Sequence, residues 1–520
     1  MAKRKRPNII IFMMDTQGAR NLSCYGYRKK TTPNIDRVAE EGTLFERHFV
    51  TAPWTLPVHA SLFTGRYESG HGAGAQHEGL EPGLPSLPEV LAQSGYLTVA
   101  FCSNSWAVSD DQWNPGKGFE EIIRYGREDV PPEPPYIHDE KLGSDNKSMK
   151  LVGVAKRWIK EKALGETRPF FMFAHNGAPH DPYRPPEPFR SQFLLQGVSF
   201  EEAVKRKGNQ VESTIGAKAL SFEDWEIQRS LYDGETACLD HRIGLFVEVL
   251  KEFGIYDETL FIIIGDHGDS QGEHIRYSYH SQNGVYDAVV HTPLVARMPG
   301  VFPAGRRVDE LVQIVDIFPM ILDLLELDQP EARKSIQGAN LLQSLEGEIR
   351  EFAVIEAQTP IHVLRRAWVR DPDCDPRWAF PALKAARTKK YKYIWHASGE
   401  DKLYDVLRDP DERWDIIDQR PEVARELQKK LEKFLMSIEQ RHYVDMRRSG
   451  RRESESEAKV LRRLAAWGLY RPGIVPPWEE EQEQSAKRPS DAEHPQDAKH
   501  KETPDKRKRA KGKSISKRTK

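Results

Sequence analysis

The sequence predicts an α/β protein with a large, mostly parallel sheet that is covered by helices on both faces. Short apolar runs typical of buried strands recur along the chain, helical patterns separate them, and 520 residues exceed the length of one small domain. Strands are expected at residues 8–14, 98–101, 170–174, 260–264 and 293–296. Helices are expected between them, for example at residues 35–41, 87–94 and 239–253. Such alternation favours a parallel sheet between two helical layers.

The pattern changes after about residue 340. Residues 387–395 alternate like a half-exposed strand, and a helix is expected over residues 422–438. We therefore predict a catalytic α/β domain over residues 1–340 and a smaller α+β subdomain that packs on it over residues 341–475. Residues 476–520 bury too little apolar surface to fold, so they are predicted to form a disordered tail. The last 20 residues hold 10 Lys or Arg against 2 acids, and weak binding to nucleic acid or to an acidic surface is the alternative to a solvated tail.

The net charge of the chain gives no sign that the whole protein is attracted to nucleic acid or to membranes. The net charge is −2, with 38% hydrophobic and 30% charged residues. The longest apolar run, residues 9–14, is far shorter than the roughly 20 residues that cross a bilayer. The four cysteines have no CxxC spacing, which favours free thiols in a reducing compartment, with two disulfides as the alternative. No signal-peptide cleavage site follows the basic N-terminus, so a cytoplasmic location is expected.

Polar side chains follow the predicted strands at their carboxyl ends. Asp15 follows the first strand, His175 follows the strand at 170–174, and Asp266 and His267 follow the strand at 260–264. Ligands of such sheets bind beyond these strand ends, so these side chains are expected to lie close together. Two carboxylates and an imidazole suit a divalent cation, and the imidazole favours zinc or manganese. The alternative is that these residues only form polar turns.

A helix is expected to begin near Thr55, in the stretch of residues 52–66. Pro57 suits the first turn of a helix, which makes Thr55 the expected N-cap. A helix N-terminus also attracts anions, so a hydroxyl at that position could attack an anionic ester. A helix cap without chemistry is the alternative.

Several motifs, in order and spacing, resemble those of the sulfatase family of the alkaline phosphatase superfamily. The resemblance begins with residues 7–15, continues through residues 60–66 and extends to about residue 470. The motifs between and after these two stretches are Leu22-Ser-Cys-Tyr-Gly-Tyr27, Thr32-Pro-Asn-Ile-Asp36, Ala178-Pro-His-Asp-Pro-Tyr183, Tyr232-Asp-Gly-Glu235, Gly265-Asp-His-Gly268, Gly272-Glu-His274, Leu403-Tyr-Asp405 and residues 461–470. The resemblance implies an alkaline-phosphatase-like fold and hydrolysis of small anionic esters.

The resemblance also implies a role for individual residues. The metal ligands would be Asp15, Asp266 and His267, with the oxygen of Thr55 also reaching the cation. His180 would donate the proton to the leaving group, and His280 is a second candidate acid. The substrate-binding candidates are Asn104, as a hydrogen-bond donor to an anion, and His274. A second metal is a further possibility, with ligands from His175, His180, Asp181 and His280; His180 and His280 would then be ligands and not acids.

The chain departs from the family signature C/S-x-P-x-R, whose first residue is oxidised to formylglycine. Here Thr55 stands at the nucleophile position, and His59, a further catalytic candidate, stands at the arginine position. Threonine cannot give the aldehyde, so the sequence favours phosphate mono- or diesters, or phosphonates, over sulfate esters. The cation would be Ca²⁺ in a sulfatase-like site and Zn²⁺ or Mn²⁺ in a phosphatase-like site. The alternatives are a catalytically silent anion-binding relative and a phospho- or sulfotransferase with an acceptor other than water.

Overall fold

The computed structural model describes residues 6–75, 79–80, 83–109, 114–125, 148–206, 220–274, 284–360, 363, 366, 369–371 and 381–440. All of these residues belong to one compact unit, residues 1–446. The predicted C-terminal tail and the motif at residues 461–470 lie outside the described residues.

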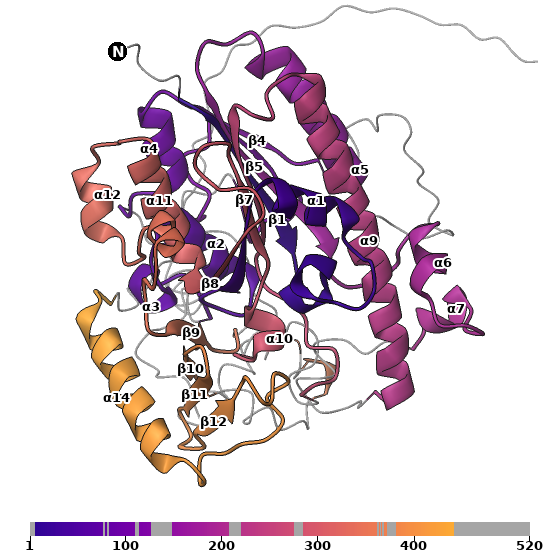
Figure 1. Cartoon of the computed structure of the whole chain (residues 1–520), viewed down its shortest axis with the longest axis vertical. Coiled ribbons are helices and arrows are strands. Elements are labelled where there is room, and N and C mark those ends of the chain that lie inside the picture. Colours follow the sequence, from indigo (N-terminus) through magenta and orange to yellow (C-terminus); the bar gives the residue numbers. More distant parts are fainter. Residues whose placement is uncertain are drawn as a thin grey trace, which may run out of the picture. The chain divides into compact units, whose positions relative to one another are not determined.

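The main sheet confirms the predicted mostly parallel architecture. In the described residues it has eight strands in the order β4-β3-β5-β1-β6-β7-β2-β8 (Figure 1). All neighbouring strands are parallel except at β7, which is antiparallel to both β6 and β2. The strands are β1 (Asn8–Asp15), β2 (Thr43–Phe49), β3 (Leu97–Phe101), β4 (Glu121–Ile123), β5 (Phe170–Pro179), β6 (Thr259–Gly265), β7 (Leu294–Arg297) and β8 (Arg306–Gln313).

Strand β1 lies between β5 and β6 in the centre of the sheet, and its side chains alternate between two cores. Ile9, Ile11 and Met13 belong to one buried cluster, whereas Ile10 and Phe12 belong to another. A strand that is covered on both faces has to be apolar at every position, which explains the continuous apolar run. Asp15 is the last residue of β1, so it lies at the carboxyl edge of the sheet.

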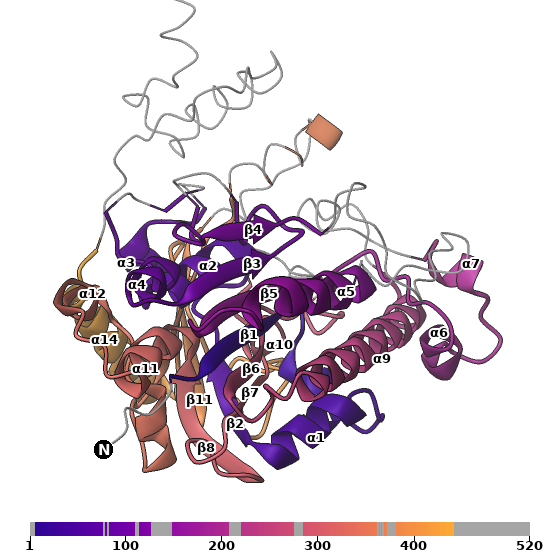
Figure 2. The ribbon, with the colours of Figure 1, turned by 90° about the horizontal axis from the view of Figure 1, so that it is seen from above.

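Helices cover both faces of the sheet (Figure 2). The first core cluster contains residues of α2 (Thr55–Thr64), α4 (Leu87–Gln93) and α11 (Ile317–Leu324). The second contains residues of α1 (Pro33–Glu41), α5 (Ser148–Trp158) and α9 (Phe222–Glu252). The other helical segments are η1 (Ala19–Asn21), η2 (Ser23–Tyr25), α3 (Glu68–His71), η3 (Ile159–Ala163), α6 (Phe189–Phe193), α7 (Phe200–Ala203), α10 (Asp287–Val290), η5 (Ile314–Asp316), α12 (Pro330–Ser335) and η6 (Leu341–Leu345).

A second, antiparallel sheet follows in the order β12-β11-β10-β9. Its strands are β9 (Ala353–Ala357), β10 (Leu383–Arg387), β11 (Tyr391–His396) and β12 (Lys402–Asp405). The single strand predicted over residues 387–395 is wrong, because β10 ends at Arg387 and the hairpin turn precedes β11. The expected C-terminal helix is confirmed as α14 (Pro421–Ser437). The predicted boundary between two domains at residue 340 stays a prediction.

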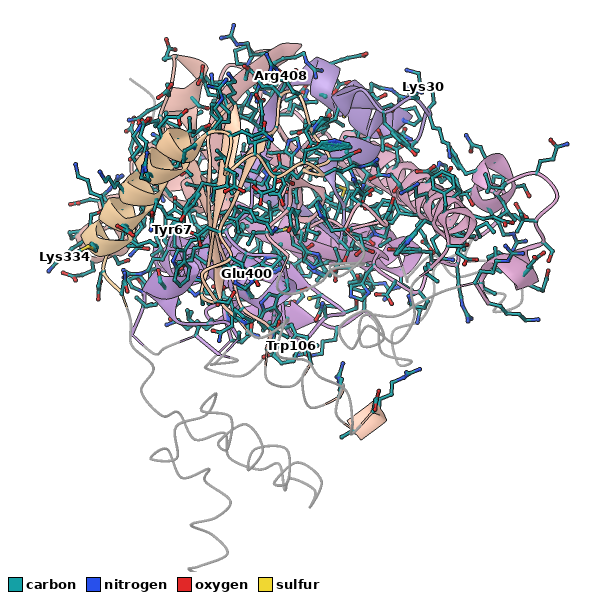
Figure 3. All side chains as sticks on the ribbon, turned by 90° about the horizontal axis from the view of Figure 1, so that it is seen from below. Lys30, Tyr67, Trp106, Lys334, Glu400 and Arg408 are labelled. Atoms are coloured by element: carbon teal, nitrogen blue, oxygen red, sulfur yellow. The ribbon has the colours of Figure 1, made fainter. Side chains whose placement is uncertain are left out.

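Helix α14 and the second sheet share an apolar core with the residues that follow α2. Leu427 and Leu431 of α14 pack in one buried cluster with Tyr67, which precedes α3. The ring of Tyr67, labelled in Figure 3, lies 5.1 Å from that of Phe434, and its hydroxyl donates a 2.9 Å hydrogen bond to Gln313 at the end of β8. Among the described residues, no helix is both long enough and apolar enough to span a bilayer.

Candidate active site

The polar cluster lies at the carboxyl ends of the central strands. Asp15 ends β1, and Asp266 and His267 directly follow β6. The expectation that His175 follows its strand is wrong, because β5 extends to Pro179 and His175 lies in its second half. Thr55 is the first residue of α2. The structure therefore brings these side chains together, and each is at most 7% exposed.

The hydroxyl of Thr55 does not cap its helix, so the predicted N-cap is wrong by one residue. Trp54, in an extended conformation (φ −156°, ψ 163°), is the N-cap, and no side chain accepts a capping hydrogen bond there. Thr55 takes the first helical position, and its Oγ1 lies 3.5 Å from Nε2 of His267. The hydroxyl thus belongs to the polar cluster and not to the helix end.

Thr16 orients both carboxylates, a role that the sequence did not reveal. Its backbone N–H donates to Oδ1 of Asp266 at 2.9 Å, and its hydroxyl donates to Oδ1 of Asp15 at 2.9 Å. Thr16 has a φ of 69°, which is strained for a β-branched residue. A second donor to Asp266 Oδ1 is the backbone N–H of His267, at 2.7 Å.

The pKa values of the two aspartates are shifted in opposite directions. Burial, together with the negative charge of Asp15, raises the pKa of Asp266 well above its usual range. Burial works against ionisation of Asp15 as well, but the charges of His180, His175 and His267 outweigh it and lower the pKa of Asp15. Two carboxylates in one buried cluster repel each other, so this site favours a cation between them.

The residues present fit a divalent cation. Asp15, Asp266 and His267 each offer one ligand atom, and these atoms all lie within 4.8 Å of one another. Oδ2 of Asp266 is buried and has no hydrogen-bond partner. Two carboxylate oxygens and one imidazole nitrogen can bind zinc, manganese or calcium. The oxygens suit all three ions, and the imidazole favours zinc or manganese.

His59 and His175 form a second group with Asp266. Their ring centroids lie 5.2 Å apart, and both side chains are fully buried. Burial is the main cause that lowers the pKa of His59 to about 3, and it also lowers the pKa of His175. The sequence did not predict this pairing. His59 lies in α2, and no motif specifies how α2 packs over β5. The prediction for a second cation instead combined His175 with residues 180, 181 and 280.

His180 directly follows β5. Its Nδ1 donates a 2.7 Å hydrogen bond to the carbonyl of Asp181, and its side chain is 35% exposed. Since its charge contributes most to the lowered pKa of Asp15, it lies within electrostatic reach of the cluster. His280, the second candidate acid, lies outside the described residues.

The two substrate-binding candidates have different surroundings. The amide of Asn104 donates to Oδ2 of Asp15 at 3.1 Å, so in this structure it contacts a carboxylate of the cluster. His274 stacks on Tyr286 with ring centroids 3.6 Å apart, and its Nε2 donates to the carbonyl of Asp411. His274 thus packs against the C-terminal part of the fold.

Comparisons with known proteins identify the family. The family model described as Sulfatase matches residues 7–327. N-acetylglucosamine-6-O-sulfatase of Bacteroides thetaiotaomicron is 24% identical over 518 residues, which covers 85% of this chain and 87% of the relative. Arylsulfatase K of Bos taurus is 25% identical over 462 residues, 82% of each chain.

Among solved structures, the phosphonate monoester hydrolase of Agrobacterium radiobacter superposes with a TM-score of 0.63 and 22% identity. The match covers 83% of this chain and 96% of that chain, which shows a shared fold. Since the family model matches more than half of the 520 residues, the chain belongs to the sulfatase family and is a hydrolase of sulfuric or phosphoric esters.

Proposed function

We propose that this enzyme hydrolyses phosphate mono- or diesters, or phosphonate esters, through Thr55 as the nucleophile and with a divalent cation. One observation carries the proposal: the hydroxyl of Thr55 is not used as a helix cap and lies 3.5 Å from His267, beside the buried carboxylates. Asp15, Asp266 and His267 would hold the cation, because one ligand atom of each lies within 4.8 Å of the others and Nε2 of His267 lies 3.5 Å from this hydroxyl. When bound, the cation would supply positive charge to the anionic ester and favour ionisation of the Thr55 hydroxyl.

The first half of the reaction transfers the phosphoryl group to the protein. Oγ1 of Thr55 gives up its proton to water and bonds to phosphorus, while the bond from phosphorus to the ester oxygen breaks. The departing alcohol oxygen takes a proton from Nε2 of His180, whose Nδ1–H stays hydrogen-bonded to the carbonyl of Asp181. General acid help of this kind contributes roughly 10²–10⁴ in rate.

The second half restores the enzyme. Water attacks phosphorus and gives one proton to the now neutral His180, while the bond between phosphorus and Oγ1 of Thr55 breaks. That oxygen regains a proton from water. The product that leaves is inorganic phosphate from a phosphate monoester, a phosphate monoester from a diester, and a phosphonate from a phosphonate ester. Protons and bonds balance over the cycle, so the net reaction consumes one ester and one water.

The identity of residue 55 favours phosphorus over sulfur. Threonine cannot be oxidised to the aldehyde that the family signature implies, so an ester formed on its oxygen has to be resolved by attack on the central atom. The similarity in fold to a phosphonate monoester hydrolase supports the same direction. The sulfatase relatives support sulfate esters, and the experiment below compares both classes.

The test measures turnover of p-nitrophenyl sulfate, p-nitrophenyl phosphate, bis(p-nitrophenyl) phosphate and p-nitrophenyl phenylphosphonate with zinc, manganese or calcium. Turnover of at least one phosphorus ester above that of the sulfate is expected. Thr55→Ser should keep measurable turnover, and Thr55→Val should lose roughly 10³-fold or more, as when other enzymes lose a nucleophile. Acid-quenched enzyme should carry a phosphoryl group on the peptide that contains Thr55.

A matched control comes from the same helix. Thr64 is buried in α2, but its hydroxyl donates to the carbonyl of Ala60 inside the helix, so Thr64→Val removes a hydroxyl outside the cluster. This variant should keep turnover close to that of the parent. Equal turnover in Thr55→Val and Thr64→Val would contradict the nucleophile, and preference for the sulfate ester would contradict the substrate class.

A further inference from the structure

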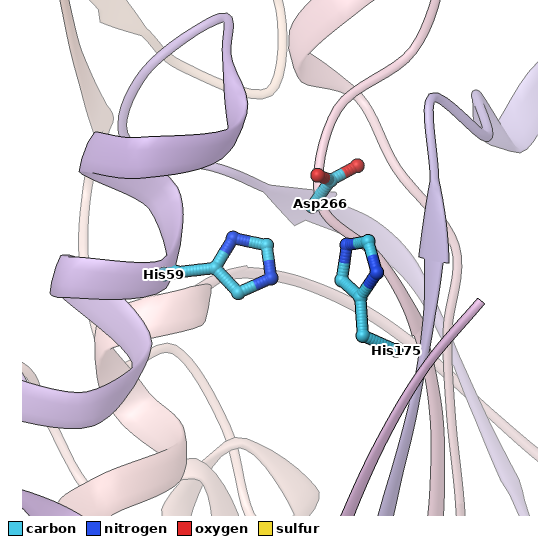
Figure 4. A group of neighbouring side chains, drawn as sticks. All are labelled: His59, His175 and Asp266. Atoms are coloured by element: carbon cyan, nitrogen blue, oxygen red, sulfur yellow. The ribbon is translucent and has the colours of Figure 1, made fainter. Parts of the chain in front are cut away.

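We propose that the chain holds a second divalent cation, of the zinc type, between His59, His175 and Asp266. The side chains come from α2, from β5 and from the residue after β6, and one ligand atom of each lies within 4.8 Å of the others. Figure 4 shows the two imidazole rings facing each other with the carboxylate of Asp266 beside them. All three side chains are fully buried. The inference goes beyond the proposed function, and its binding test does not depend on turnover.

Unused ligand atoms are the first argument. Nε2 of His59, both ring nitrogens of His175 and Oδ2 of Asp266 are buried without a hydrogen-bond partner. Nε2 of His175 lies 3.6 Å from Oδ2 of Asp15, and Oδ2 of Asp266 lies 3.6 Å from Nε2 of His267. A buried polar atom without a partner is unfavourable, because it has lost its hydrogen bonds to water. Four such atoms in one contact group indicate that they serve a partner other than the protein itself.

The orientation of His59 fits a cation as this partner. Its Nδ1 donates a 2.7 Å hydrogen bond to the carbonyl of Thr55, and a carbonyl can only accept. In the neutral ring Nε2 then carries a lone pair, so it cannot donate to the carboxylate of Asp266. An imidazole that donates one N–H to a backbone carbonyl and offers the other nitrogen is the arrangement usual for a metal ligand.

Position 59 gives an independent argument from charge. The family signature has arginine there, and arginine carries a permanent positive charge, whereas a neutral histidine carries none. A cation bound by this histidine would restore the missing charge. The substitution thus exchanges a fixed guanidinium for a metal ligand.

Asp266 would bridge the two cations. Its Oδ1 accepts hydrogen bonds from Thr16 and His267, and its Oδ2 is the oxygen without a hydrogen bond. It also belongs to both ligand groups, with His59 and His175 on one side and with Asp15 and His267 on the other. Two imidazoles and one carboxylate are a zinc donor set that leaves a fourth position open. Thr55 and His59 are four residues apart on α2, so their side chains lie on the same face of the helix.

The experiment counts metal. The full-length protein is stripped with a chelator, dialysed against a small excess of zinc and measured by plasma mass spectrometry, and zinc binding is followed by calorimetry. The parent should bind two zinc ions per chain. His59→Arg, His59→Gln and His175→Asn should each bind one. One zinc in the parent, or two in all three variants, would overturn the inference.

A control histidine and a spectroscopic readout keep the result independent of folding defects. His71 is equally buried, but both of its ring nitrogens have hydrogen-bond partners, so His71→Gln should still bind two zinc ions. Two manganese ions that share Asp266 should give a spin-coupled electron paramagnetic resonance signal in the parent and an isolated-ion signal in His59→Arg. An isolated-ion signal in the parent at full loading would overturn the bridge. Two zinc ions without ester turnover would contradict only the proposed function, and turnover with one zinc only this inference.

Discussion

The side-chain amide of Asn104 donates a 3.1 Å hydrogen bond to Oδ2 of Asp15, while the amide oxygen of Asn104 accepts one from the backbone N–H of Trp106. The loop after β3 therefore fixes the orientation of a carboxylate at the end of β1. Contacts that orient a metal ligand are typically worth 10–100-fold in metal affinity or activity. Replacement of Asn104 is therefore expected to change the affinity for the cation and not only the binding of the substrate.

Asn104→Ala should weaken metal binding about 10–100-fold and lower kcat/KM with it. Competition with a chelator measures the affinity, and excess metal should partly restore turnover. Ser103→Ala, at the exposed neighbouring position, should change neither quantity. Unchanged metal affinity with a raised KM would show instead that Asn104 binds the substrate directly.

His180 gives a prediction that depends on the leaving group. If its Nε2 protonates the departing oxygen, His180→Gln should slow an alkyl phosphate ester by roughly 10²–10⁴ and a p-nitrophenyl ester far less, because p-nitrophenolate leaves without a proton. The comparison of kcat for the two esters is the measurement. An equal loss for both esters would indicate that His180 is a ligand or a positioning residue.

The central strands were predictable because their positions need apolar residues on both faces. Strands β2 and β8 were not, since β8 lies at the edge of the sheet and carries Arg306, Arg307 and Asp309 on its exposed positions. The antiparallel direction of β7 follows from the path of the chain after β6, which composition does not encode. The same limit explains why residues 387–395 resembled one strand and form parts of two.

At the site, the strand-end rule placed Asp15, Asp266 and His267 together, and the structure brings them within 4.8 Å. The meeting of His59 with His175 could not be predicted, because it depends on how α2 packs over β5. The hydroxyl of Thr55 shows the effect of a single position, since the N-cap lies at residue 54 and not at residue 55, and this leaves the hydroxyl free of a capping role.

Gly268 should be intolerant of a side chain. A Cβ at this position would lie 2.4 Å from the carbonyl oxygen of Ala288 and 3.0 Å from Cα of Gly18. Gly268→Ala would push these backbones apart and displace the adjacent His267, so kcat/KM should fall by roughly 10²-fold. Gly347→Ala, where no atom lies within 4 Å, is the matched control and should keep full turnover. Full turnover in Gly268→Ala would show that His267 tolerates the shift.

Asp240 predicts a pH dependence of stability away from the site. Burial raises its pKa from 3.8 to about 7, although the backbone N–H of Ile35 and the side chain of Asn34 donate to it. Between pH 4 and 7 the folded state therefore holds a proton that the unfolded chain has lost, so stability from this group is complete below pH 4 and is lost as the pH rises through 7. Asp240→Asn removes this titration.

The free energy of unfolding of Asp240→Asn, relative to the parent, should therefore rise by about 3 kcal/mol between pH 5 and pH 8. Denaturant unfolding of both chelator-treated proteins at several pH values measures the difference. A constant offset at all pH values would show that Asp240 does not titrate in this range.

Lys392 is the buried cation that joins the second sheet to α10. Its Nζ lies 2.7 Å from Oδ1 of Asp287 and 2.8 Å from Oε1 of Glu412, and its side chain is fully buried. Burial and the charge of Asp287 raise the pKa of Glu412 to about 7 even with this lysine present. Lys392→Met should destabilise the protein by about 3–5 kcal/mol at pH 8, because it leaves the buried Glu412 without this cation and Asp287 with Arg387 alone.

The matched control is Lys402→Met. Lys402 is a half-exposed lysine of the same sheet, and its Nζ lies 3.6 Å from Oδ2 of Asp415. Its cost should stay within about 1 kcal/mol. The loss in Lys392→Met should also shrink at pH 6, where Glu412 takes up a proton and no longer needs the lysine. Equal losses in the two variants at pH 8 would show that the buried carboxylates are neutralised by another group, and the neighbouring Arg387, 2.9 Å from Asp287, would be the first candidate.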